Sequence, residues 1–294
     1  MSAATGARVR VAMRDPAPRT WLRLAPALLL VGGLSLGALG AIITRSLGSP
    51  PSLAAYRSLV TDPEFWPSVA LTLHVAVTST VLSVVLGIGL ALLLRRVAVG
   101  RRTLTTLAQV NLPIPHVIGA VAMLLLLSQS GLVSRVATAT GLIDSPAGMP
   151  ALLFDPYAIG VILQYVWKEV PFVAVVALAI LRGAGEDLEQ AAATLGASRW
   201  QRFRFVTLPV LLPGVSSAAI IVFAFAFGTF EVPLLLGASY PAVLPVMAHR
   251  RYTDVDLASR PEALALALLI TLFVVIVVLV GVGLARRAVR RAGT

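Results

Sequence analysis

The sequence places two opposite charges side by side inside a long apolar stretch. Lys168 and Glu169 lie near the middle of residues 157–181, which contain no other Asp, Glu, Lys or Arg. A charge at the bilayer centre costs about 2.5–3.5 kcal/mol on insertion scales, so neither side chain is expected to face lipid. Either one of them lines a solute path, or both pair with neighbouring helices or a second subunit. Glu231, just before Pro233, contacts either the solute or a docked protein partner, or lies in the membrane interface.

Residue types that perform catalysis or bind metals are sparse. The chain has no cysteine, which excludes disulfides and thiolate metal sites. Its three histidines, His74, His116 and His249, are scattered along the sequence. A phosphate-binding loop of the Walker A type ends in Gly-Lys-Ser/Thr, whereas the only lysine, Lys168, is followed by Glu169. We therefore expect no catalytic residue, no metal, no cofactor and no ATP hydrolysis by this chain.

Residues 185–209 are typical of two short helices joined by a tight turn. Acidic residues stand where a helix N-terminus favours negative charge, and a run of alanines with high helix propensity follows them. Gly196 suits the end of the first helix, because glycine adopts a left-handed conformation at low cost. Ser198 is a good N-cap for the second helix, and Pro209 is expected to end it.

The second of these helices carries an apolar stripe. Trp200, Phe203 and Val206 recur every three residues, and arginines stand beside them. An apolar stripe on a water-facing loop has to be covered. The segment is therefore predicted to dock a cytoplasmic partner. The alternative is an amphipathic hairpin that lies on the membrane surface.

The composition indicates that a membrane positions these residues. Of the 294 residues, 58% are hydrophobic and only 13% are charged, and mean hydropathy is +0.91; soluble domains have about 45–50% apolar residues. A helix needs about 20 apolar residues to cross the hydrocarbon core. Pro171 is expected to break or kink the fourth of the stretches that qualify. The six predicted spans are residues 24–43, 68–94, 103–130, 157–181, 208–230 and 263–285.

Basic residues alternate from one side of these spans to the other. Of the 24 Lys and Arg residues, 17 fall on the side that holds both termini and six on the opposite side. The positive-inside rule therefore places both termini in the cytoplasm. A nucleic-acid-binding surface would not alternate in this way. Despite the net charge of +11, we therefore expect no nucleic acid partner.

The domain organisation follows from these spans. We predict an all-α integral membrane protein with six transmembrane helices and one permease domain, residues 24–285, between basic tails 1–23 and 286–294. The first span is longer than the apolar core of a cleaved signal peptide and is expected to stay as an anchor. Short coupling helices between the fourth and fifth spans occupy the loop 185–209.

The loop resembles a known family. The pattern Gln190-Ala191-Ala192, Gly196 and Leu208-Pro209 looks like the "EAA" loop of type I binding-protein-dependent ABC importer permeases, which have a MetI-like fold. In that family the loop seats in a groove of the ATP-binding subunit. The family's leading glutamate falls at Gln190, one place after Glu189, which weakens a specific salt-bridge role. The resemblance assigns ATPase coupling to Glu189, Gln190, Ala191, Ala192, Gly196, Trp200, Phe203, Leu208 and Pro209.

The resemblance also implies partners and a mechanism. They are a cytoplasmic ATP-binding subunit, a second permease subunit, identical or distinct, and an external solute-binding protein, all acting at the inner membrane by alternating access. Residues 113–116, 167–172 and 227–237 look most like permeases of the polyamine, iron, thiamine and phosphonate cluster, and a polyamine is the expected solute.

Two other classes of function stay open. An ion-gradient-driven secondary transporter would favour an inverted repeat and clustered acids at the membrane midplane. An intramembrane enzyme would need converging Ser, His and Asp side chains or metal ligands.

Overall fold

The computed structural model describes residues 18–97 and 100–292, in which all regular structure is helical. The predicted N-terminal tail falls mostly outside these residues. The helices are α1 Pro18–Leu47, α2 Ala54–Thr61, α3 Phe65–Arg96, α4 Arg101–Gln109, α5 His116–Leu127, α6 Leu132–Ala139, η1 Pro146–Gly148, α7 Ile159–Leu181, α8 Ala184–Thr194, α9 Arg199–Arg202, η2 Phe203–Thr207, α10 Leu208–Gly228, α11 Glu231–Leu236, α12 Leu244–Tyr252, η3 Leu257–Ser259 and α13 Arg260–Ala292.

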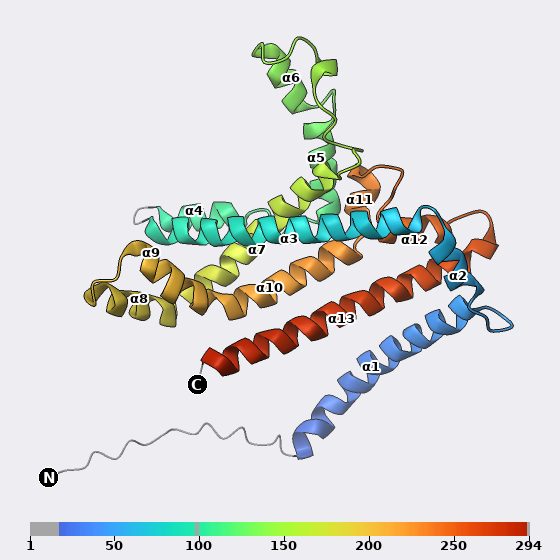
Figure 1. The fold of residues 1–294 in the computed structure, drawn as a ribbon, viewed down its shortest axis with the longest axis horizontal. Helices are drawn as coiled ribbons and strands as arrows, with labels where there is room; N and C mark the ends of the chain where they lie inside the picture. The colour runs from blue at the N-terminus through green and yellow to red at the C-terminus, as the bar shows by residue number, and fades with distance from the viewer. Residues whose placement is uncertain (1–17, 98–99, 293–294) are drawn as a thin grey trace.

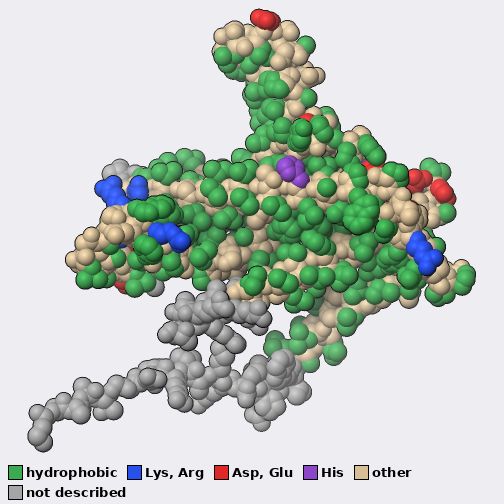
Figure 2. All heavy atoms as spheres, in the orientation of Figure 1, with side chains coloured by type: hydrophobic (Ala, Val, Ile, Leu, Met, Phe, Trp, Pro, Cys, Tyr) green, Lys and Arg blue, Asp and Glu red, His purple; other side chains and the backbone are tan. Residues whose placement is uncertain are grey.

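The long apolar helices form a bundle (Figure 1). Helix α3 packs on α7 and α10, α10 packs on α13, and α1 lies against α13. Hydrophobic side chains cover the visible middle of the bundle, and most charged side chains gather toward its two ends, with further acidic side chains at the tip of the projecting arm (Figure 2). Six helical segments are long and apolar enough to cross a membrane, which confirms the predicted fold class. They are Leu24–Leu47, Phe65–Arg96, His116–Ala139, Ile159–Leu181, Arg199–Gly228 and Leu257–Leu284.

The third span differs from its prediction. Residues 103–130 were predicted as one span whose start is interrupted by Asn111, Pro113, Pro115 and His116. The interruption is real, since α4 ends at Gln109 and α5 begins at His116. Pro113 and Pro115 lie in the intervening turn, where their missing N–H groups prevent a regular helix from continuing. The spanning segment runs from His116 to Ala139 instead. In Figure 1, α5 and α6 project away from the rest of the bundle.

Helix α3 packs extensively on α7. Gly87 of α3 faces Val173 of α7, and a Cβ atom built on Gly87 would lie 2.7 Å from the Val173 Cβ. Ala91, Val173 and Leu211 belong to one buried apolar cluster between α3, α7 and α10. A second cluster contains Tyr165 and Phe227, so the buried core continues along the bundle.

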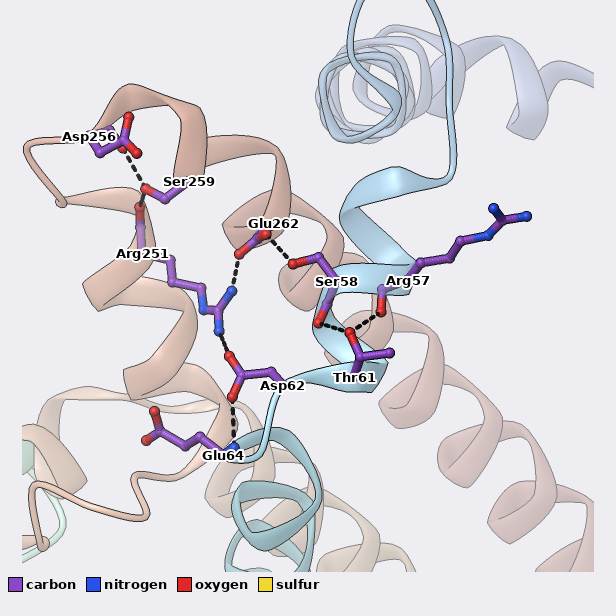
Figure 3. A network of polar contacts seen from close by, with 9 residues as sticks. All are labelled: Arg57, Ser58, Thr61, Asp62, Glu64, Arg251, Asp256, Ser259 and Glu262. Carbon is purple, nitrogen blue, oxygen red and sulfur yellow. Dashed lines mark hydrogen bonds and ion pairs between the residues drawn. The ribbon is translucent and has the colours of Figure 1, made fainter.

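Ion pairs tie the short helices together at the outer end of the bundle (Figure 3). The Arg251 guanidinium of α12 donates to the carboxylates of Asp62 and Glu262. The Ser58 hydroxyl of α2 also donates to Glu262, at 2.5 Å, and Asp62 accepts from the Glu64 N–H at 2.7 Å. This outer network joins α2, α12 and the first turn of α13.

Candidate functional site

The loop between α7 and α10 contains the two predicted short helices. Helix α8 ends in a Schellman motif at Gly196, whose φ is +83°. The Gly196 N–H donates to the Ala193 carbonyl and the Ala197 N–H to the Ala192 carbonyl, both at 3.0 Å. The predicted helix stop at Gly196 is confirmed. We call α8, α9 and η2 together, residues 184–207, the coupling segment.

The second short helix begins as predicted but does not stop where expected. Ser198 forms a capping box with Gln201, in which each side chain bonds the other residue's backbone N–H. After Arg202 the backbone continues through the π-helix η2 directly into α10. Pro209 lies in the first turn of α10, so the prediction that it ends the helix was wrong. A π-turn accommodates an extra residue without ending the helix.

Glu189 points back toward the bundle from α8. The Arg95 guanidinium, in the last turn of α3, donates to both of its carboxylate oxygens, at 2.9 and 2.6 Å. The Thr207 hydroxyl of η2 donates to one of the same oxygens. The Arg95 bonds, more than that of Thr207, lower the pKa of Glu189 against the opposing effect of burial. These three residues, which we call the Glu189 clamp, join α3, α8 and η2.

Most other residues predicted to couple to an ATPase are accessible. Gln190, Ala191, Gly196, Trp200 and Pro209 are exposed, whereas Ala192, Phe203 and Leu208 are half-buried. The rings of Trp200 and Phe203 lie 5.7 Å apart, measured between their centroids.

Sequence reasoning missed two apolar side chains of the coupling segment. Leu195 is 88% exposed and Phe205 is 72% exposed. Leu195 stands at the end of α8, and a large apolar residue directly before a predicted glycine stop was the available signal. Phe205 lies within η2, whose wider turn does not follow the three-residue spacing on which the predicted stripe rests.

A cavity of about 700 Å³ lies where the coupling segment meets α3. It is lined by Leu92, Arg95, Arg96, Glu189, Arg199, Trp200, Arg202, Phe203 and Thr207. We call it the basic cavity, because four of its side chains are arginines and one is an acid. Sequence reasoning did not predict it, since its residues come from segments that are about 100 positions apart.

Within the membrane, Lys168 stabilises the turn between α4 and α5. Lys168 is only 3% exposed. The ammonium group donates to the carbonyls of Asn111 and Ile114 at 2.6 Å and of Leu112 at 3.2 Å. These carbonyls lie where the helical pattern stops, and Lys168 satisfies them where water is scarce.

The same break compensates for a proline in α7. Pro171 has no N–H, so the Trp167 carbonyl one turn earlier lacks its helical donor. The Asn111 side-chain amide donates to this carbonyl at 2.5 Å. Of the break or kink expected at Pro171, the break does not occur, because helix α7 continues through this residue.

Glu169 has a different partner from that of Lys168. Its carboxylate lies 3.3 Å from the His116 Nε2 at the start of α5. The His116 ring packs against Phe225 of α10, with 4.4 Å between centroids, and the His116 carbonyl accepts from Gln164. Lys168 therefore contacts the turn that precedes α5, whereas Glu169 contacts the first residue of α5. Glu231 is exposed and opens α11.

Comparisons with known proteins agree on one family. Residues 83–293 match the family described as "Binding-protein-dependent transport system inner membrane component". The molybdenum transport system permease protein ModB of Mycobacterium tuberculosis is 35% identical over 209 residues, which cover 69% of this chain and 75% of the relative. A probable molybdenum ABC transporter permease protein of Haloferax volcanii is 32% identical over 258 residues, 85% of this chain and 86% of the relative.

A solved structure shares the fold. A chain of a bacterial alginate ABC transporter, in complex with a periplasmic protein bound to an alginate pentasaccharide, superposes with a TM-score of 0.73. The match has 22% sequence identity and covers 92% of this chain and 98% of that chain.

Proposed function

Because this chain belongs to the family of binding-protein-dependent transport system inner membrane components, we propose that it carries molybdenum, as an oxyanion, through an ABC importer. The chain is a multi-pass permease subunit of an inner-membrane ABC importer. The single observation behind the molybdenum proposal is that two relatives above 30% identity bear that name, one of them across 85% of this chain. The comparisons do not support the polyamine expected from sequence likeness.

The intramembrane charges are consistent with an anion rather than a polycation. A polyamine path would need carboxylates that are free to meet ammonium groups. Glu169 is only 12% exposed and lies against His116, and Lys168 is engaged by three carbonyls. We assign Glu169 and His116 to the wall of the path, Lys168 to the support of that wall, and Glu231 to its outer end.

The exposed face of the coupling segment is the proposed contact with the ATP-binding subunit. Gln190, Ala191, Gly196 and Trp200 carry that contact, and the exposed Leu195 adds an apolar side chain that water alone would otherwise cover. Phe203, Leu208 and Pro209 stand behind this face and link it to α10, and the Glu189 clamp links it to α3. Glu189 thus acts inside this chain rather than at the partner.

The remaining partners follow from the class of transporter. An external binding protein delivers the solute to the outer end, where the Arg251 network holds the short helices together. A second permease subunit completes the path within the bilayer. The solved alginate transporter, which holds a periplasmic protein, supports this arrangement.

Uptake of radiolabelled molybdate by cells that carry the whole transporter tests the solute. We expect ATP-dependent uptake that an excess of tungstate, an oxyanion of the same shape and charge, inhibits and that putrescine does not. Inhibition by putrescine alone would restore the polyamine. Uptake that persists without ATP but stops when the proton gradient is collapsed would favour a secondary transporter.

The coupling assignment has its own test. Trp200→Asp and Leu195→Asp should each abolish co-purification of the ATP-binding subunit and uptake, because each places a charge in an apolar contact. Gln201→Glu changes a neighbouring exposed residue of α9 and serves as the control, with co-purification retained. Retention of the ATP-binding subunit by both Asp variants would place its docking site elsewhere while leaving the molybdenum proposal intact.

A further inference from the structure

We propose that the basic cavity binds the phosphate group of an anionic phospholipid from the cytoplasmic leaflet. This site goes beyond transport of the solute, since it lies on the cytoplasmic side of the protein and between α3 and the coupling segment. A lipid held there would contact both the span that anchors the Glu189 clamp and the short helix that carries Trp200.

The charges of the cavity favour a phosphate. Glu189 balances Arg95 through the clamp. Arg96, Arg199 and Arg202 line the same cavity, and none of them forms an ion pair with a carboxylate among the described residues, although the Glu189 charge also acts on Arg202. The Nε of Arg202 is buried without a hydrogen-bond partner in the described part of the chain. Guanidinium groups bind phosphate oxygens through charged hydrogen bonds, so three of them in one cavity form a phosphate-binding set.

The position of the cavity favours a lipid as the carrier of that phosphate. Arg95 and Arg96 end α3, the second membrane span, and Leu92 lies one turn deeper. Trp200 and Phe203 add aromatic surface, and aromatic residues are enriched at the membrane interface. Basic pockets between transmembrane helices on the cytoplasmic side are suited to anionic headgroups. The cavity therefore offers arginines to a headgroup and apolar surface to the glycerol and upper chain.

The cavity and the proposed docking face are largely separate surfaces. Gln190, Ala191, Leu195 and Gly196 do not line the cavity, and of the residues assigned to the docking face only Trp200 does. An acidic segment of the ATP-binding subunit would be the competing occupant. The membrane-level Leu92 in the lining argues for a ligand with an apolar part, which a lipid supplies.

Lipid titration of the purified transporter, followed by native mass spectrometry, tests the proposal. The probes are phosphatidylglycerol, phosphatidylcholine and inorganic phosphate. The test variant is Arg96→Gln with Arg199→Gln. The matched control is Arg182→Gln with Arg204→Gln, which removes two exposed arginines from the same side of the membrane but outside the cavity.

We expect the wild-type transporter to retain phosphatidylglycerol in preference to phosphatidylcholine. Its affinity should fall by roughly tenfold or more in the cavity variant, as each cation near an anionic lipid surface contributes about a factor of five. The control variant should stay within about twofold of the wild type.

Three results would overturn the proposal. Equal weakening in both variants would show general attraction to the leaflet and no site. Displacement of the lipid by millimolar inorganic phosphate would assign the cavity to a soluble anion. Loss of the ATP-binding subunit from the cavity variant, with lipid affinity unchanged, would assign the arginines to that subunit.

Discussion

The carboxylate of Glu189 receives hydrogen bonds from residues on either side of it in the sequence, Arg95 before the coupling segment and Thr207 at its end. The side chains of the Arg95–Glu189 pair are 24% and 15% exposed. The pair is thus less exposed to water than a surface ion pair, and it is bidentate. Its contribution to stability therefore exceeds the small contribution that exposed ion pairs make. At this scale a single carboxylate fixes where α8 lies relative to α3.

Glu189→Gln should destabilise the purified chain by about 1 kcal/mol at neutral pH, because the bidentate charged bond is lost. The lowered pKa of Glu189 sets the pH dependence. The stabilisation by the Glu189 carboxylate is complete above the ordinary glutamate pKa of about 4.3. It is lost as the pH falls through the lowered pKa. Thermal unfolding in detergent from pH 8 to pH 3 should show a constant difference from wild type that shrinks only below about pH 4.

Two companions sharpen this measurement. Asp187→Asn removes an exposed acid from the same helix, and we expect a smaller loss of stability, because only its interaction with the helix N-terminus is lost. Exchanging the charges, with Arg95→Glu and Glu189→Arg together, should restore part of the stability and of the uptake per ATP hydrolysed. If the difference in stability between the wild type and Glu189→Gln vanished already at pH 6, the assigned direction of the Glu189 pKa would be contradicted.

Lys168→Met separates support of the path wall from contact with the solute. Three carbonyls lose their donor in an environment with little water, so we expect a loss of about 3 kcal/mol or more in stability. His74→Leu, which changes an exposed polar residue of α3, should have little effect. If Lys168→Met unfolds at the wild-type temperature but fails to transport, Lys168 serves the solute instead.

At the scale of elements, the sequence predicted most of what is local. The apolar stretches, the glycine stop of α8 and the Ser198 cap were predictable because each depends on a few adjacent residues. An interruption at Asn111, Pro113, Pro115 and His116 could be predicted from these residue types. Its stabilisation could not, because Lys168 and Asn111 exchange hydrogen bonds between α7 and the turn. The continuity of α9 into α10 was missed because a proline after a π-turn looks, in sequence alone, like a terminator.

The glycine stop of α8 can be tested by backbone conformation alone. No atom lies within 4 Å of a Cβ added to Gly196, so the cost of a side chain there is the left-handed φ and not a clash. Gly196→Val should cost about 1–2 kcal/mol and reduce uptake. Gly196→Asn, a residue that tolerates this conformation, should keep most of the activity. Equal activity of the two variants would show that the turn is free to change.

The α3–α7 contact can be tested by packing. Gly87→Leu should destabilise the chain by about 1–3 kcal/mol, because its Cβ would lie 2.7 Å from the Val173 Cβ. Gly89→Leu makes the same change two residues away, where no atom lies within 4 Å, and should be tolerated. Thermal unfolding of both variants checks the difference, and similar melting temperatures would refute this helix arrangement.

At the scale of the whole molecule, two polar assemblies hold opposite ends of a largely apolar bundle. The Glu189 clamp joins elements at the cytoplasmic end, and the Arg251 network joins α2, α12 and α13 at the outer end (Figure 3). Between them the core is mostly apolar, and the contacts of Lys168, Asn111 and Glu169 are its main polar exceptions. Both ends are therefore where partners can act on the bundle.

Arg251→Met should loosen the outer end, because Asp62 and Glu262 lose their shared cation. Limited proteolysis of the purified chain should then cut residues 48–64 faster than in the wild type. Arg250→Met removes a neighbouring arginine and serves as the control. Within the described residues, the Arg250 guanidinium donates only to the exposed Ser239 carbonyl. The cleavage rate of Arg250→Met should be unchanged, and equal rates in the two variants would deny the network a structural role.

The helical backbone runs without a break from Arg199 to Gly228, a length of about 45 Å at 1.5 Å per residue. It therefore connects the coupling segment on the cytoplasmic side to the outer side of the bundle. Because no loop interrupts this segment, we expect a displacement at Trp200 to be transmitted along α10 toward Gly228. Thr229, directly after α10, shares a hydrogen bond with the Tyr165 hydroxyl of α7 at 2.7 Å, so we expect a displacement of α10 to reach α7 through this contact.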